Sequence, residues 1–459
     1  MAPLPRTGIT SDSSSLETAA CLQGRVGLRF CLLDSWRNYS QKACGGKGVF
    51  SGDGPDCGGS CFKNRASGKG EVVADKNKSQ EIPFGRPWIG AEEKAAVLSV
   101  LDSPILTHGP KGKEFEKGFA KMMSGGHAIS TSSCMASLHL ASLDLKLGPG
   151  DEVLVPAMTH VATVHAVELT GAKPVFVDCE TTTGNMDTVL LEKAITPKTK
   201  AAFVVHFAGI PADMKAILKI TGKKNLPVVE DCALAVGARV GSTHVGLLGI
   251  LGCYSFYPVK HITTGEGGML VSTDETRLNR IAKFRAFNVD RTHTERSIPG
   301  FYEVTGVGLN YRMSELQAAL GCAQLNRVDE ILKRRAKNFS ILKSGLENLE
   351  GIKLLDSPDA ERTSSHYCAV VLLQGRIRER RNEMVALLGA QGIGTSIYYP
   401  HPVPRFQYYA QKYGYEKGQC PGAEAIADES LALPVGPHLD ESAMVAIIQG
   451  MQEALKKIS

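Results

Sequence analysis

The chain has 459 residues, of which 43% are hydrophobic and 22% charged, as is ordinary for a globular protein of two or three domains. No apolar run approaches the roughly 20 residues that a membrane-spanning helix needs, so we expect no membrane partner. The net charge of +5 is concentrated in residues 1–80, which hold 11 basic and 7 acidic side chains. The near-neutral remainder lacks the basic footprint of a nucleic-acid-binding protein.

The first 80 residues form a segment unlike the rest of the chain. They are rich in Gly and Ser and carry no sustained helical or strand period. We expect residues 1–80 to be a disordered extension, or to follow from a start codon assigned too far upstream. A targeting peptide is a further alternative, because residues 25–37 are basic and partly apolar, although they lack the long apolar run of a secretory signal.

The 12 cysteines indicate a reducing compartment. Five lie within residues 1–80, and the other seven are scattered singly, as at Cys232, Cys253 and Cys322. Scattered cysteines in a large chain usually act as small buried hydrophobes, so we expect a cytoplasmic protein. Cys57 and Cys61 have the spacing of half a metal site, but no second Cys/His pair at ligand spacing follows, and we predict no metal.

The folded body begins near Ile82 with two helices and then alternates strands and helices. The periodicity of apolar residues predicts helices at 90–101 and 113–123, separated by a turn at 107–110. Strands are then expected at 151–156, 174–178, 200–205 and 226–231, and helices at 135–147, 161–170, 187–195 and 213–221. This alternation indicates an α/β domain with a mostly parallel, buried sheet.

The remainder of the chain is mainly helical and ends in a smaller α+β region. Helices are expected at 275–287, 314–325 and 328–346, followed by strands at 367–373 and 395–399 and helices at 423–430 and 441–458. We therefore predict three parts: the extension 1–80, a large domain 81–340, and a small C-terminal domain 341–459.

Residues 252–270 carry the strongest chemical signal. A short apolar strand leads into a polar loop with Lys260, two threonines and the glycine-rich run 264–268. Burial between two strands would lower the pKa of this lysine and free its amine to attack a carbonyl carbon. Lys260 is thus a candidate Schiff-base nucleophile; taken alone, a surface loop lysine is the simpler interpretation.

Three more residues match the needs of a pyridoxal-phosphate site. Besides the lysine, such a site requires an acid beside the pyridine nitrogen, a group on the ring face and donors for the phosphate. Asp231, at a strand end, fits the acid, and His160 fits the ring face. Ser133 lies at a helix N-terminus, where free backbone N–H groups suit a phosphate. Each also has a structural interpretation, as a turn cap, a helix-start histidine or an ordinary N-cap.

From about Ile82 to Ile458 the sequence resembles the DegT/StrS family of pyridoxal-phosphate-dependent sugar aminotransferases. Single motifs of this family are weak signals, but several in the same order are specific. The blocks that carry the resemblance are 82–87 with 106–110, 147–153, 171–178, 229–231, the Lys260 loop, and 310–319.

The resemblance implies an aspartate-aminotransferase-like α/β fold (fold type I) with a mostly parallel sheet and a smaller C-terminal α+β domain. It implies that Lys260 forms the Schiff base, that Asp231 pairs with the pyridine nitrogen and that His160 stacks on the ring. Four residues would bind the phosphate: Ser133, Cys134, Met135 and Ser255. Family sites form at a homodimer interface, across which Asn310 would reach the cofactor of the neighbouring subunit.

The implied reaction moves an amino group from glutamate to a nucleotide-linked keto-sugar, either a 4-keto-6-deoxy or a 3-keto sugar. Four residues are candidates for touching the sugar: Thr107, His108, Tyr399 and His401. They could equally be packing or turn residues, and the sequence does not choose between the two kinds of sugar.

Two departures from the family pattern keep an alternative open. Cys134 and Met135 stand where Gly-Thr is usual, which removes a hydroxyl donor to the phosphate. Leu234 stands where Gln or His is usual, which removes a hydrogen bond to the phenolic oxygen of the cofactor. A pyridoxal-phosphate-binding regulator or non-transaminating homologue therefore remains possible, as does an enzyme of the same fold acting on amino acids. Lys260 argues against the dehydratases of the family, which carry a histidine there.

Overall fold

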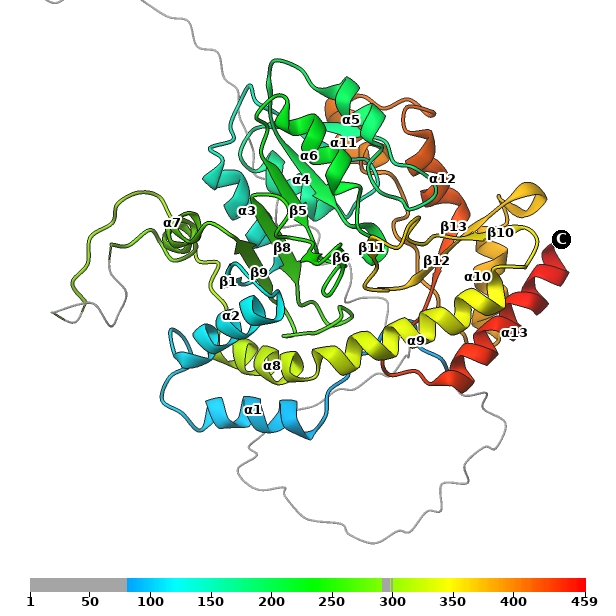
Figure 1. Ribbon diagram of the computed structural model, residues 1–459, viewed down its shortest axis with the longest axis horizontal. Coiled ribbons are helices and arrows are strands. Elements are labelled where there is room, and N and C mark those ends of the chain that lie inside the picture. The colour runs from blue at the N-terminus through cyan, green and yellow to red at the C-terminus, as the bar shows by residue number, and fades with distance from the viewer. Residues whose placement is uncertain (1–80, 291–297, 299) are drawn as a thin grey trace, which may run out of the picture. The chain divides into compact units, whose positions relative to one another are not determined.

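A seven-stranded sheet lies at the centre of the computed structural model, which describes residues 81–290, 298 and 300–459 (Figure 1). In spatial order the strands are β1 (His127–Thr131), β9 (Gly268–Ser272), β8 (Leu251–Ser255), β5 (Val228–Asp231), β4 (Thr199–Val205), β2 (Glu152–Pro156) and β3 (Lys173–Val177). Strand β9 runs antiparallel to both of its neighbours, and the other pairs are parallel. The predicted α/β class with a mostly parallel sheet is confirmed.

Helices cover both faces of this sheet. Successive side chains of a strand point to opposite faces, and here apolar side chains on both faces pack against helices. On one face, Phe203 of β4 packs with Leu138 of α3. On the other face, Val204 packs with Ile217 of α6. The first face is covered by α3 (Cys134–Asp144), α4 (Val161–Glu168) and α7 (Glu275–Arg285). The second is covered by α2 (Pro110–Met122), α5 (Thr188–Ala194), α6 (Met214–Gly222) and α8 (Glu315–Asn326).

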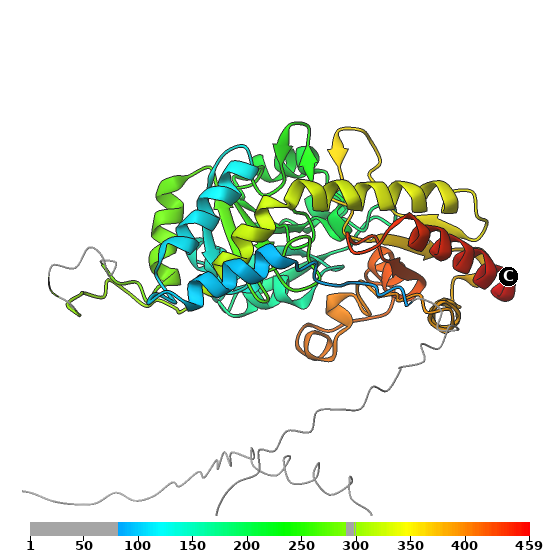
Figure 2. The ribbon, with the colours of Figure 1, turned by 90° about the horizontal axis from the view of Figure 1, so that it is seen from below.

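A long helix, α9 (Val328–Leu346), leads from the large sheet to a smaller one, and Figure 2 shows it extending along both regions. The smaller antiparallel sheet is built from β10 (Ile352–Leu354), β12 (Ala369–Leu373) and β13 (Ser430–Leu433). Its core contains Phe339 of α9, Val371 of β12 and Ile447 of α13. The remaining C-terminal helices are α10 (Arg381–Ala390), α11 (Gln407–Tyr413), α12 (Pro421–Glu429) and α13 (Glu441–Ile458).

Other elements frame these two sheets. Helix α1 (Ala91–Leu101) packs on α8. A small third sheet joins β11 (Arg362–Thr363), β6 (Arg239–Val240) and β7 (Thr243–His244). The predicted boundary between residues 340 and 341 falls inside α9, and the division into a large and a small domain stays a prediction. The expectations for residues 1–80 lie outside the described residues.

The structure corrects one local prediction and adds a strand that the sequence analysis does not predict. The strand expected at 395–399 is reduced to one bridge between Ser396 and Ala432, after which the chain turns towards the large sheet. Residues 127–131, for which the sequence predicts no strand, form the edge strand β1. That strand is stabilised by pairing with β9, more than 130 residues away, which its short and partly polar sequence does not indicate.

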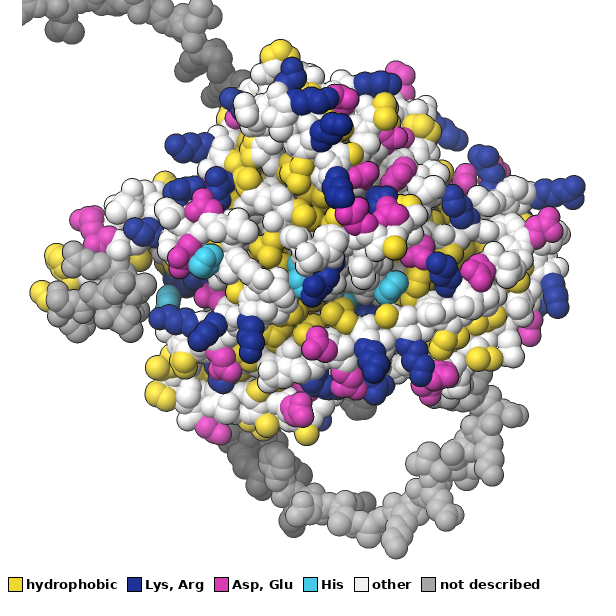
Figure 3. Space-filling view, in the orientation of Figure 1, with side chains coloured by type: hydrophobic (Ala, Val, Ile, Leu, Met, Phe, Trp, Pro, Cys, Tyr) yellow, Lys and Arg dark blue, Asp and Glu magenta, His cyan; other side chains and the backbone are white. Residues whose placement is uncertain are grey.

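The described residues also bear on membrane and surface character. Within them, no helix combines the length and apolar character required to cross a bilayer. On the face drawn in Figure 3, basic and acidic side chains are interspersed.

Candidate active site

Lys260 lies in the connection between β8 and β9, which hydrogen bonds hold in one shape. Phe256 accepts from the Thr264 N–H at 3.0 Å and from the Thr263 hydroxyl at 2.9 Å, and its own N–H donates to Gly267 O at 2.9 Å. The Lys260 Nζ lies 5.1 Å from the centre of the Tyr367 ring. Loss of solvent lowers the pKa of Lys260, and the nearby Cys134 and Asp231 oppose this shift. The structure therefore supplies a lysine with enhanced nucleophilic character.

Asp231, the last residue of β5, is buried, and neighbouring groups donate to both of its carboxylate oxygens. The Thr163 hydroxyl lies 2.7 Å from Oδ2. The Ala233 N–H lies 3.0 Å from Oδ1, and the Cys134 thiol 3.8 Å from the same oxygen. A buried charge is tolerated when hydrogen bonds of this kind satisfy it. Asp231 is therefore fixed in position at the carboxyl end of the central strand.

The first turn of α3 begins beside this carboxylate. Ser133 is its N-cap, and the Ser133 hydroxyl accepts from the Ala136 N–H at 3.1 Å. The N–H groups of Cys134 and Met135 have no acceptor within the helix, because their partners would lie before its start. Such groups, together with the helix dipole, form an anion site. The Cys134 thiol points inward, 3.5 Å from Cys253 O, so the helix offers backbone N–H groups rather than this side chain.

Gly268 allows β9 to pass unusually close to this turn. A Cβ atom added to Gly268 would lie 2.5 Å from Ser133 C and O and 2.7 Å from Cys134 N. These atoms belong to the backbone, so rotation of a side chain could not relieve the clash. The glycine thus lets β9 pack against the first turn of α3 without displacing the N–H groups that would suit a phosphate.

His160 and Tyr399 lie beside the same end of the sheet. His160 caps α4 and accepts from the Ala162 N–H at 3.2 Å. Its ring meets that of Tyr399 edge-on, with centres 5.6 Å apart. The imidazole keeps an exposed face, and partial desolvation followed by the charge of Lys260 lowers its pKa. The histidine therefore lies within the electrostatic influence of Lys260.

The other predicted site residues have different positions. Ser255 ends β8 as a buried residue, and its hydroxyl accepts from the Tyr257 N–H at 3.4 Å. Asn310 is exposed and pairs with Ala286 in an isolated bridge. Leu234 is a packing residue of the core beneath the small sheet, as its apolar side chain requires.

The candidate sugar contacts do not form one group within this chain. Thr107 and His108 line a cavity of about 190 Å³ that also contains Arg285 and Arg312. His401 is exposed, and its Nδ1 accepts from Arg405 at 2.8 Å. Of the four residues, Tyr399 alone is joined to the Lys260 side of the molecule by a described contact, and the roles of all four stay predictions.

Two neighbours of the site were missed by the sequence analysis. Thr163 follows His160 by less than one helical turn, so a careful reading of that turn could have found it. Tyr367 lies just before β12 of the small sheet, more than 100 residues after Lys260. No local sequence pattern connects these two residues.

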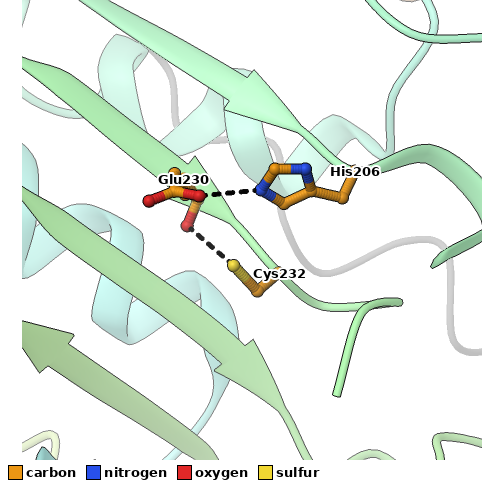
Figure 4. Close-up of side chains that lie close together, drawn as sticks. All are labelled: His206, Glu230 and Cys232. Atoms are coloured by element: carbon orange, nitrogen blue, oxygen red, sulfur yellow. Dashed lines mark hydrogen bonds and ion pairs between the residues drawn. The ribbon is translucent and has the colours of Figure 1, made fainter. Parts of the chain in front are cut away.

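His206, Glu230 and Cys232 lie close enough together to suggest a metal centre (Figure 4). Glu230 Oε2 accepts from His206 Nε2 at 3.0 Å and from the Gly246 N–H at 2.8 Å. Its Oε1 accepts from the N–H groups of Leu248 and Gly249. His206 Nδ1 accepts from a backbone N–H at 3.1 Å, which leaves the proton on Nε2. Because these ligand atoms already take part in hydrogen bonds within the protein, the group stabilises the fold next to Asp231.

A partly buried lysine, a neighbouring acid and an open helix N-terminus define a protein of the pyridoxal-phosphate-dependent class, whose cofactor these residues fit. Residues 87–452 match the DegT/DnrJ/EryC1/StrS aminotransferase family, and the chain belongs to this family. The predicted family, the predicted cofactor and the predicted class of enzyme, a pyridoxal-phosphate-dependent sugar aminotransferase, are therefore confirmed.

Individual relatives agree with this assignment. The spore coat polysaccharide biosynthesis protein SpsC of Bacillus subtilis is 34% identical, over 83% of this chain and 99% of its own length. Spr1654 of Streptococcus pneumoniae, solved in its PLP form, is 28% identical with a TM-score of 0.78, over 83% of this chain and 100% of its own. The sugar aminotransferase CalS13 of Micromonospora echinospora is 27% identical with a TM-score of 0.74, over 81% and 99%.

We predict that Gly268→Ala weakens binding of pyridoxal phosphate by at least roughly tenfold, because the added methyl group displaces the first turn of α3. Fluorescence titration of the apoprotein with the cofactor measures this. Gly389→Ala is the matched control, since a Cβ there meets nothing within 4 Å. Equal cofactor affinity of a folded Gly268→Ala protein would refute the assignment of this turn.

Proposed function

We propose that this protein transfers an amino group from glutamate to a nucleotide-linked keto-sugar, of the 4-keto-6-deoxy or the 3-keto kind, and so makes an amino sugar. The observation that carries the proposal is the convergence of Lys260, Asp231 and the first turn of α3 at one end of the sheet. The names of SpsC and CalS13 support a sugar acceptor.

Bound pyridoxal phosphate supplies an electron sink for the charge left when a proton departs from the α-carbon of the donor. Lys260 would hold the cofactor, and its released amine would move that proton. Desolvation, which lowers the pKa of Lys260, increases the fraction of neutral amine that can accept it. Asp231 would hold a proton on the ring nitrogen through its buried carboxylate.

Other residues of the chain would bind and orient the cofactor. The N–H groups of Cys134 and Met135, with the hydroxyls of Ser133 and Ser255, would bind the phosphate. His160 would pack on the face of the cofactor ring. Its imidazole is positioned by the edge-on contact with Tyr399. With the Cys134 thiol turned inward, backbone donors take the place of the hydroxyl that the family usually has.

We further propose a homodimer with shared active sites, in which Asn310 binds the cofactor phosphate of the neighbouring subunit. Asn310 is exposed and pairs with Ala286 in an isolated bridge. Residues shortly before it in the chain carry exposed apolar side chains. Phe301 is 65% exposed and Val307 91%. Exposed apolar groups that gather in one segment favour a protein partner.

We also propose that the protein is located in the cytoplasm. Seven cysteines in the described residues are free thiols, and six of these are buried. Free thiols of this kind are usual in a reducing compartment, which supports a cytoplasmic location.

The acceptor is tested by incubating the loaded protein and glutamate with a 4-keto-6-deoxy and a 3-keto nucleotide sugar, in parallel with simple 2-oxo acids. Mass spectrometry detects amination of the acceptor. We expect an amino sugar from one of the nucleotide sugars and slower amination of the 2-oxo acids. Amination confined to the 2-oxo acids would contradict the proposed acceptor.

The shared site is tested by mixing two inactive variants, Lys260→Ala and Asn310→Ala. In a mixed dimer one site combines the native lysine of one subunit with the native asparagine of the other, so transamination should reappear after mixing. If Asn310 acted within its own subunit, no site would regain both residues and the mixture would stay inactive. Mixing Lys260→Ala with itself under the same conditions controls for handling.

A further inference from the structure

A short chain of buried hydroxyl groups stands behind the Asp231 carboxylate. The Thr163 hydroxyl lies 2.7 Å from Asp231 Oδ2, and the Thr159 hydroxyl lies 2.8 Å from that of Thr163. Thr159 is 1% exposed, Thr163 0% and Asp231 4%. Water therefore has little access to these three groups, and their polar atoms depend on one another.

The direction of these hydrogen bonds follows from the number of protons. A threonine hydroxyl has one proton to donate and two lone pairs with which to accept. An ionised Asp231 can only accept, so Thr163 donates its single proton to the carboxylate. Thr163 then accepts from Thr159, which makes the pair cooperative.

The two carboxylate oxygens are used differently. Oδ1 accepts from the Ala233 N–H and from the Cys134 thiol. Among the described residues, Thr163 supplies the only hydrogen bond to Oδ2. A carboxylate oxygen can accept two hydrogen bonds, so Oδ2 keeps one position open. The hydroxyl of Thr163 orients the oxygen that remains available to a donor from the cofactor.

The local fold places Thr163 with little freedom. Thr159 and His160 follow the end of β2, and α4 begins at the next residue. The Thr163 N–H donates to His160 O at 3.2 Å in this first turn. A threonine side chain has two main χ1 rotamers in a helix, and the bonds to Asp231 and Thr159 hold the one in which the hydroxyl faces the carboxylate. One helical turn thus presents His160 and Thr163 to the same site.

We propose that Thr163 is a positioning residue: its hydroxyl fixes the Asp231 carboxylate and favours its ionised form, and Thr159 orients Thr163. The proposal rests on the proposed role of Asp231 at the ring nitrogen of the cofactor. With the donor removed, the proton between the ring nitrogen and Asp231 moves towards the carboxylate, because an unsupported buried charge is unfavourable. No group is transferred to or from Thr163 itself.

The test reads the ring nitrogen directly. The full chain is loaded with pyridoxal phosphate labelled with 15N at that nitrogen, and its 15N NMR shift is recorded for wild type, Thr163→Val and Thr163→Ser. We expect the wild type and Thr163→Ser to show a protonated nitrogen, and Thr163→Val to move towards the unprotonated shift.

Thr221→Val is the matched control, because it removes an equally buried threonine hydroxyl, which donates to Ile217 O at 2.9 Å in α6. It should leave the 15N shift at the wild-type value. If Thr163→Val does not fold, Thr159→Val replaces it and should shift the resonance less, in the same direction.

Two results would overturn the proposal, and they are distinguishable. An unchanged 15N shift in Thr163→Val, with a protonated wild type, would reduce Thr163 to a packing residue and leave the proposed role of Asp231 intact. An unprotonated ring nitrogen in the wild type itself would remove the role of Asp231, and with it the proposed mechanism.

Discussion

The parallel pairing of β5 with β8 is the constraint on which the site depends. In this pair Asp231 lies opposite Cys253, so the last residue of β5 is held beside the strand from which the Lys260 loop departs. The Cys134 thiol contacts both Asp231 and Cys253 and ties the first turn of α3 to the same point. A slip of one residue would turn Asp231 to the opposite face of the sheet. One strand register therefore sets the acid, the lysine loop and the helix N-terminus relative to each other.

The small sheet's region completes the surroundings of the lysine through a short segment before β12. The Ser365 N–H donates to Gly209 O at 3.0 Å, and Ser365 O lies 3.1 Å from His261 Nε2. These bonds attach the segment to the residue next to Lys260. Tyr367 is thereby held with its ring near the Lys260 amine. The surroundings of the lysine thus combine residues of the large sheet, such as Asp231, with Tyr367 from the segment before β12.

How much of this could be predicted follows from where each signal lies in the sequence. Asp231 stands at the end of a predicted strand, Ser133 at the start of a predicted helix and Lys260 in the loop that follows a predicted strand, and parallel strands bring such positions to one edge. The structure brings these three together as that rule expects. Tyr367 could not be predicted, because its position depends on packing between segments far apart in the chain. Thr163 lies within reach of a periodicity argument, but its partner becomes visible only once β5 and α4 are placed.

The most direct test of the account is the visible absorption spectrum of the protein with pyridoxal phosphate, before and after addition of glutamate. Wild type is compared with Lys260→Ala and with Lys333→Ala, which removes an exposed lysine of α9. The account predicts a visible band in wild type and Lys333→Ala that disappears with glutamate, and no such band in Lys260→Ala. A band that does not need Lys260, or one that glutamate leaves unchanged, would contradict it.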